Sequence, residues 1–187
     1  ILNEPDSGAQ AIGDPTEAAL VAAAALVGLR KPDLEAAFPR VAELPFDSVR
    51  KRMTTIHKMP TDESDLPPSL APIWERRYTP GGNTAPYIAF TKGALDGLLN
   101  ISPSIWIDGH VKPLDEEWRS RIMAAHDEMA AKGMRVLGVA LRPWETTPST
   151  TTEEGLEEDL IFLGMFGVDG GFPLPRRPPA LAGSRRE

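Results

Sequence analysis

The chain of 187 residues contains no cysteine. This absence excludes a disulfide framework, a cysteine-ligated zinc or iron–sulfur site and a cysteine nucleophile. Its three histidines, His57, His110 and His126, lie far apart and lack the spacing of metal ligands, so we expect structural or exposed roles for them. No apolar run approaches the length of about 20 residues that a membrane-spanning helix needs.

Basic residues are in the minority. The chain has 20 Lys and Arg against 27 Asp and Glu, which gives a formal net charge of −7. Nucleic-acid-binding domains carry a basic footprint, so this balance argues against general nucleic-acid binding. The shares of hydrophobic residues (41%) and charged residues (25%) are ordinary for a globular protein. We therefore expect one large domain or two small ones, with a hydrophobic core large enough to make the fold stable without disulfides.

Several motifs of nucleotide-binding and hydrolytic enzymes are missing. The sequence has no GxxxxGK[ST] phosphate loop, no GxGxxG, no GxSxG and no HExxH. Asp169 follows a predicted strand, as a phosphotransfer aspartate does, but lacks the Lys, Thr and second Asp that such a site needs. The chain does not look like a complete enzyme. It begins at Ile1 without Met or a signal-peptide pattern, and we expect it to be a piece of a longer protein.

Two long helices are predicted. The first lies in residues 13–29, where Asp14 suits the capping position and Pro15 the first helical position. The second follows the capping residue Asp115 and ends at Gly133. Its apolar face combines side chains at helical spacing, namely Trp118, Ile122, Ala125 and Met129. A short helix is expected at "ALDGLL", residues 94–99.

Strands are predicted where β-branched and apolar residues gather, and Asp108–Gly109 is a hairpin signal between two of them. The predicted strands are residues 40–44, 53–57, 87–93, 104–107, 110–114, 134–141 and 160–168. Residues 60–86 are expected to be a surface excursion with a mobile tip, and residues 142–159 a polar loop. The mixture predicts the α+β class, with a mainly antiparallel β-sheet flanked by helices.

Four short stretches occur in a telling order: "GDPTEAAL" at 13–20, "PFDSVRKRM" at 45–53, "FTKGALDGLL" at 90–99 and "GMRVLGVAL" at 133–141. Together they resemble the nucleotide-binding (N) domain of P-type ATPases, specifically the type II cation pumps of the calcium-pump group. The phosphorylation motif DKTGT and the transmembrane helices of that family are absent. The resemblance implies an N domain at residues 1–168, cut from the cytoplasmic part of an integral membrane pump. Residues 169–187 are expected to be a disordered tail rich in Gly, Pro and Arg.

The resemblance also implies roles for residues in the first two stretches. Glu17, beside Thr16, matches the Glu that reaches the adenine amino group, although a helix-capping role also explains it. Phe46 matches the ring on which adenine stacks, the alternative being an ordinary core Phe. Lys51 matches the Lys near adenine and phosphates, and Met53 lines the pocket.

The last two stretches complete the implied pocket. Lys92 matches the family's pocket Lys, and Gly93 leaves room for the base; a solvated Lys at a strand end is the alternative. Arg135 matches the phosphate-binding Arg, with an ion pair on the sheet surface as the alternative. Leu137 lies beside the adenine in the family.

Ser48 departs from the family pattern. Calcium pumps often carry an Arg at this position, so the corresponding phosphate contact is expected to be weaker or to be made by Arg50. The implied ligand is ATP with its accompanying Mg²⁺, and the implied partners are the phosphorylation and actuator domains of the parent pump. The isolated domain is expected to bind ATP and present its γ-phosphate without hydrolysing it. The alternative is a regulatory or interaction module that keeps the fold and has lost nucleotide binding.

Overall fold

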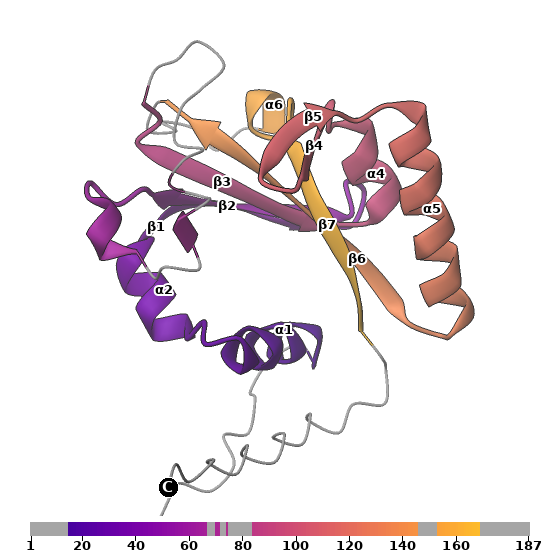
Figure 1. The fold of residues 1–187 in the computed structure, drawn as a ribbon, viewed down its shortest axis with the longest axis horizontal. Helices are drawn as coiled ribbons and strands as arrows, with labels where there is room; N and C mark the ends of the chain where they lie inside the picture. Colours follow the sequence, from indigo (N-terminus) through magenta and orange to yellow (C-terminus); the bar gives the residue numbers. More distant parts are fainter. Residues whose placement is uncertain (1–14, 67–69, 72–73, 75–83, 146–152, 169–187) are drawn as a thin grey trace, which may run out of the picture.

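The computed structural model describes residues 15–66, 70–71, 74, 84–145 and 153–168, without the side chains of 15–17 and 153–154. In this part the chain forms a seven-stranded sheet with the order β1-β2-β3-β6-β7-β4-β5 (Figure 1). The strands are β1 (Arg40–Asp47), β2 (Arg52–Lys58), β3 (Tyr87–Gly93), β4 (Ser104–Ile107), β5 (His110–Pro113), β6 (Arg135–Trp144) and β7 (Ile161–Val168). The helices are α1 (Pro15–Leu26), α2 (Lys31–Ala37), the 3-10 helix η1 (Glu63–Asp65), α4 (Leu95–Asn100), α5 (Glu116–Ala131) and α6 (Glu153–Leu156).

The sheet is antiparallel at every pairing except that of β4 with β7. The predicted α+β class with a mainly antiparallel sheet flanked by helices is therefore confirmed. Among the described helices, none is both long enough and apolar enough to cross a membrane.

The two faces of the sheet pack against different helices. Successive side chains of a strand point to opposite faces, so directly paired residues share a face. The face that contains Thr54, Thr91 and Ala140 packs against α4 and α5, and we call it the α4–α5 face. The opposite face contains Phe90 and Leu141, and we call it the α1–α2 face because α2 and, further along, α1 lie on that side (Figure 1).

Local signals place several elements where the sequence predicted them. Asp115 caps α5, its Oδ1 accepting a hydrogen bond of 3.0 Å from the backbone N–H of Trp118. The hairpin between β4 and β5 turns at Asp108 and Gly109, with φ angles of 51° and 77°. The first helix begins at Pro15 as predicted.

Among the described elements, two α-helices, the 3-10 helix η1 and one buried segment were not predicted. The seven-residue α2 and the four-residue α6 are too short to show a helical period, and α6 lies in the predicted polar loop. The excursion at 60–86 is not all surface, because Leu66 is buried in the core under the α1–α2 face. Residues 1–14, the tip of the excursion at 75–83 and the predicted tail, with Asp169, lie outside the described residues.

Candidate functional site

Phe46 is an exposed aromatic residue on the edge strand β1. Its side chain is 59% exposed, so the interpretation of Phe46 as an ordinary core residue is wrong. The β1–β2 register shifts between the pairs Leu44↔Thr54 and Asp47↔Arg52, which leaves Pro45 and Phe46 together opposite Met53. Such a bulge re-aims the strand and interrupts its ladder. The structure thus presents a large aromatic ring to solvent beside Met53.

Met53 and Lys92 continue the same row across the sheet. Met53 pairs with Lys92, and Lys92 pairs with Val139 on β6. Leu137 lies two residues before Val139 and therefore shares its face. Neighbouring strands are about 4.8 Å apart, so Phe46 and Lys92 lie about 10 Å apart across the row. Four of the predicted site residues, Phe46, Met53, Lys92 and Leu137, are thus gathered at one part of the sheet.

Ser48 and Lys51 lie in the exposed turn between β1 and β2. Asp47 organises this turn, its Oδ1 accepting hydrogen bonds of 2.8 Å from the backbone N–H groups of Val49 and Arg50. Those two bonds, the Arg50 bond first, hold the pKa of Asp47 below its ordinary value. Lys51 has a φ of 52°, a left-handed conformation that non-glycine residues rarely adopt, and its carbonyl accepts a 2.9 Å bond from Ala94 N–H.

The remaining predicted residues lie on the opposite face, at the edge of this group, or among the side chains that the structure does not describe. Gly93 follows Lys92 and points to the opposite face, where a Cβ atom would lie 2.6 Å from the carbonyl oxygen of Lys51. Its lack of a side chain therefore serves the close approach of two backbones. Arg135 is exposed at the start of β6, two residues before Leu137 and on the same face of the sheet. The residues Thr16 and Glu17 lie in the first turn of α1, and their side chains are outside the described part.

Arg50, which was suggested for the phosphate contact that Ser48 cannot make, is bound to Glu157 in this structure. Its Nη1 donates hydrogen bonds of 2.7 Å to both carboxylate oxygens of Glu157, and its side chain is only 10% exposed. Arg52 Nε and Thr54 Oγ1 donate to the same carboxylate, at 2.6 Å and 2.8 Å. Thr54 Oγ1 also lies 2.9 Å from Thr91 Oγ1. We call these five side chains the Glu157 cluster, which lies on the α4–α5 face.

Glu157 is the residue that the sequence analysis missed. It is 3% exposed and directly follows α6. Burial raises the pKa of Glu157, but the hydrogen bonds from Arg50, Thr54 and Arg52 outweigh burial and hold that pKa below its ordinary value. The carboxylate is thus charged near neutral pH. The one signal in the sequence is the close spacing of Arg50 and Arg52, which indicates a shared acidic partner. Nothing in the local sequence distinguishes Glu157 from its exposed neighbour Glu158.

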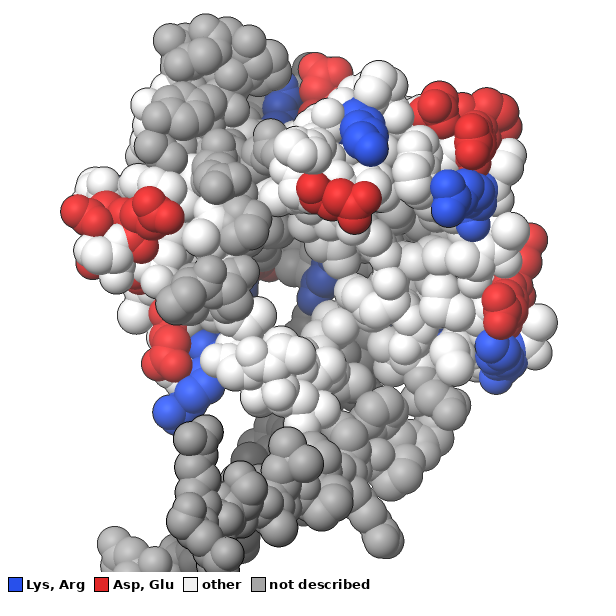
Figure 2. Space-filling view, viewed as in Figure 1, with Lys and Arg blue, Asp and Glu red and all other residues white. Residues whose placement is uncertain are grey.

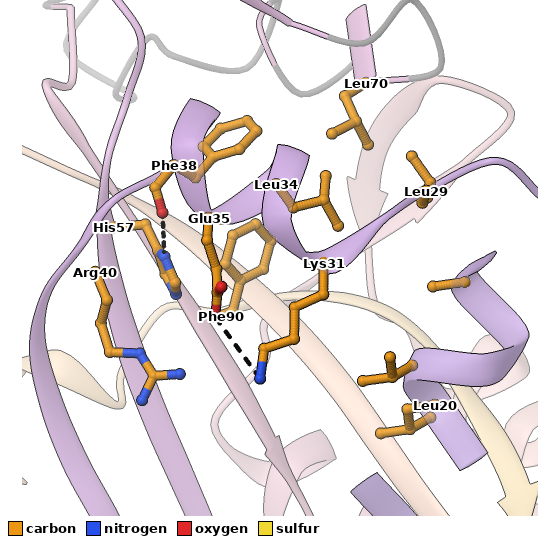
Figure 3. Close-up of a pocket in the computed structure, with 12 residues that line it drawn as sticks. Leu20, Leu29, Lys31, Leu34, Glu35, Phe38, Arg40, His57, Leu70 and Phe90 are labelled. Atoms are coloured by element: carbon orange, nitrogen blue, oxygen red, sulfur yellow. Dashed lines mark hydrogen bonds and ion pairs between the residues drawn. The ribbon is translucent and has the colours of Figure 1, made fainter. Parts of the chain in front are cut away.

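A cavity of about 390 Å³ lies on the α1–α2 face, between that face and the two helices (Figure 3). Its walls are mainly apolar, and Phe90 on its sheet side lies two residues before Lys92 on the same strand. Helix α1 contributes Leu20, Val21 and Ala24. Figure 2 shows a hollow between α1 and the sheet on the viewed face, with a basic side chain visible inside it. The cavity and the Phe46–Lys92 row therefore occupy the same side of the sheet.

His57 forms part of the cavity wall and has structural partners. Its ring nitrogens lie 2.8 Å from the carbonyl oxygen of Phe38 and 3.0 Å from Thr55 Oγ1. The ring also meets Phe90 edge-on, with the centroids 5.8 Å apart. Burial lowers the pKa of His57, more than the bond to the Phe38 carbonyl raises it, and the charge of Arg40 lowers it further. A neutral ring that donates from Nδ1 to Phe38 and accepts at Nε2 from Thr55 fits this setting.

Comparison with known proteins identifies the fold. Residues 2–170 match the protein family described as "P-type ATPase, cytoplasmic domain N". The chain belongs to this family of N domains. The N domain is 35% identical over 156 residues to Calcium-transporting ATPase 1 of Bacillus cereus, and 32% identical over 156 residues to the Calcium-transporting ATPase of Bacillus subtilis. It is 27% identical over 157 residues to the Probable cation-transporting ATPase F of Mycobacterium tuberculosis.

These alignments cover most of the N domain and a small part of each relative. Each covers 83% of the chain, and 15%, 15% and 14% of the three relatives respectively. The family resemblance inferred from the four sequence stretches is confirmed.

In the part of the N domain that the structure describes, no group of three or more His, Asp or Glu side chains is placed to hold a metal ion.

Proposed function

We propose that this N domain binds ATP through its adenine base and presents the γ-phosphate to the phosphorylation domain of a cation pump. The observation that carries the proposal is the exposed ring of Phe46, held beside Met53 and in line with Lys92. Covering a large exposed aromatic side chain with a ligand is favourable, because it removes apolar surface from water. A flat base is a suitable cover, because base–aromatic stacking is worth about 1–3 kcal/mol.

The charges nearby suit a polyphosphate. The chain as a whole is acidic, so ATP is repelled at long range and must be attracted locally. Lys51 in the hairpin turn and Lys92 in the row supply positive charge close to Phe46, and Arg135 supplies more at the start of β6. Ser48 supplies none. We propose that the phosphates are held by these three cations in place of a GxxxxGK[ST] phosphate loop, which leaves the γ-phosphate accessible.

That accessibility fits a divided catalytic site. An N domain that holds adenosine at one end lets the γ-phosphate reach an aspartate on a neighbouring domain when the two domains close. Mg²⁺ arrives with the nucleotide, and its protein ligands belong to the partner domain. The actuator domain is a further partner in the parent pump. Relatives named calcium-transporting ATPases make calcium the ion that we propose for the parent protein.

A titration with ATP tests the proposal. One stack and a few exposed ionic contacts supply only about 4–6 kcal/mol, so we expect a dissociation constant of roughly 0.1–1 mM. Isothermal calorimetry or NMR shift mapping measures it on the chain as it stands, with Phe46, Met53 and Lys92 among the shifted resonances. The absence of any shift at about 10 mM ATP, tenfold above this range, would favour the alternative.

The alternative is a module that keeps the N-domain fold and has lost nucleotide binding. Ser48 favours it, because a Ser removes a positive charge that calcium pumps often place in this turn. The same turn retains Lys51, and the platform of Phe46 is exposed. These two features make ATP binding the better supported function.

Lys51→Ala should weaken ATP binding by about two- to fivefold at low salt and leave adenosine binding nearly unchanged. An exposed Lys acts on the phosphates through screened charge, so the loss should shrink as salt rises. Titrations with ATP and adenosine at two salt concentrations measure both effects. The matched control is Lys112→Ala, because Lys112 is exposed on β5 at the far edge of the sheet. An equal loss for adenosine and ATP would remove Lys51 from the phosphate-binding role.

A further inference from the structure

Glu157 connects the segment between α6 and β7 to the β1–β2 hairpin, which carries Phe46 and Lys51. Its carboxylate receives hydrogen bonds from Arg50 in the turn and Arg52 at the start of β2, which lie 107 and 105 residues away in sequence. A buried carboxylate needs this many donors, because an unpaired charge in the interior is strongly unfavourable. The same hydrogen bonds that stabilise the buried carboxylate therefore also fix the positions of the Arg50 and Arg52 side chains.

Arg50 also bonds to the backbone next to Phe46. While Nη1 bonds to Glu157, Nη2 donates a 2.9 Å hydrogen bond to the carbonyl oxygen of Pro45. Pro45 and Phe46 are the two residues of the bulge, where the β1–β2 ladder is interrupted. The ladder therefore does not fix the peptide before Phe46, and the guanidinium bond does so instead.

Glu157 itself is anchored to the centre of the sheet. Arg142 on β6 donates hydrogen bonds of 2.5 Å and 2.9 Å to the carbonyl oxygens of Gly155 and Glu158, on either side of Glu157. The carboxylate is thus a fixed point that lies on the opposite face of the sheet from Met53 and Lys92. The contact of Arg50 with Glu157 on the α4–α5 face can in this way set the orientation of the Phe46 ring on the α1–α2 face.

We propose that Glu157 is a positioning residue for the nucleotide site, which through Arg50 and the Pro45 carbonyl fixes the orientation of Phe46. This inference rests on the proposed function, since it concerns the platform on which adenine stacks. Arg50 acts here through the fork of its guanidinium, which reaches Glu157 and Pro45 at once. A Lys ammonium is a single point charge and cannot span both partners.

The test is a matched pair of charge-conserving variants, Arg50→Lys and Arg52→Lys. Each weakens the bonding of one Arg to Glu157 and leaves the net charge unchanged, but only Arg50 also bonds to Pro45. Arg50→Lys is expected to raise the dissociation constants of both adenosine and ATP by roughly three- to tenfold, part of what complete loss of a base stack gives. Arg52→Lys is expected to keep both constants within about twofold, although the stability of the two variants falls similarly.

Affinities are measured by titration well below the melting temperature of each variant, so that every sample is folded. The aromatic ¹H–¹³C resonances of Phe46 in the ligand-free protein are a second readout, expected to move in Arg50→Lys and to stay in Arg52→Lys. Glu157→Gln is a further variant that should act in the same direction as Arg50→Lys. Unchanged affinities and unchanged Phe46 resonances in Arg50→Lys and Glu157→Gln would overturn the positioning role. A wild-type chain that binds neither ligand would instead overturn the proposed function, and this inference with it.

Discussion

Phe46→Ala is expected to weaken ATP binding by about 1–3 kcal/mol, or roughly five- to 150-fold, and to change the melting temperature little. The ring is 59% exposed, so its removal leaves almost no cavity in the core. In the proposed complex it supplies the flat surface on which the base lies. Calorimetric titration with ATP and adenosine, together with thermal melting, measures the two quantities on one sample. The losses for ATP and adenosine should be equal, because the proposed contact of the ring is with the base.

Two control substitutions, one at an exposed residue and one in the core, calibrate this result. Val49 is 88% exposed in the same hairpin, and Val49→Ala should change neither affinity nor melting temperature. Phe162 is fully buried on the α4–α5 face, and Phe162→Ala should destabilise the fold by about 3–5 kcal/mol. A Phe46→Ala protein that melts like Phe162→Ala yet binds ATP normally would show that Phe46 has a structural role and no part in the pocket.

Glu157→Ala is expected to lower the free energy of unfolding by about 3–5 kcal/mol. The substitution leaves the buried guanidinium of Arg50 and the side chains of Arg52 and Thr54 without their shared acceptor. Urea unfolding measured at neutral pH gives the difference directly. Glu158→Ala is the matched control, because Glu158 is the next residue, is exposed, and contributes only its backbone carbonyl to the Arg142 bond.

The same carboxylate makes stability depend on pH. The folded pKa of Glu157 lies below its ordinary value of 4.5, so the folded state binds fewer protons than the unfolded state in the interval between the two. The contribution of Glu157 is therefore fully present above about pH 4.5 and is lost as the pH falls through the folded pKa. Glu157→Gln should flatten this part of the stability profile relative to wild type. An unchanged acid profile would mean that other carboxylates carry the acid sensitivity.

The sequence predicted the elements whose signals are local. The Asp115 cap sets the start of α5, and the Asp108–Gly109 pair sets the β4–β5 turn, because each needs only its immediate neighbours. Strand order needs contacts between distant segments, so the parallel pairing of β4 with β7 and the central place of β6 were not predicted from the pattern. The α4–α5 and α1–α2 faces follow once the register is known.

The candidate site was predictable in its residue types and less so in its geometry. The resemblance singled out Phe46, Met53 and Lys92, and the register sets them in one row. The role of Arg50 could not be read locally, because its partner Glu157 lies 107 residues away. Gly93 was expected to make room for a base, whereas the register places it against the backbone of Lys51. In both cases the deciding contact comes from a segment that is distant in the sequence.

The long separation within the Glu157 cluster also orders the steps by which the domain forms. Strands β1 and β2 are synthesised long before Glu157, and contacts of this sequence distance form only after a large loop has closed. The hairpin can pair early, but the turn that carries Lys51 stays without its anchor until the segment from α6 to β7 has joined the sheet. The addition of the α6–β7 segment to the sheet is therefore the step that completes the β1–β2 hairpin. Chains cut short before residue 157 should stop with that hairpin incompletely ordered.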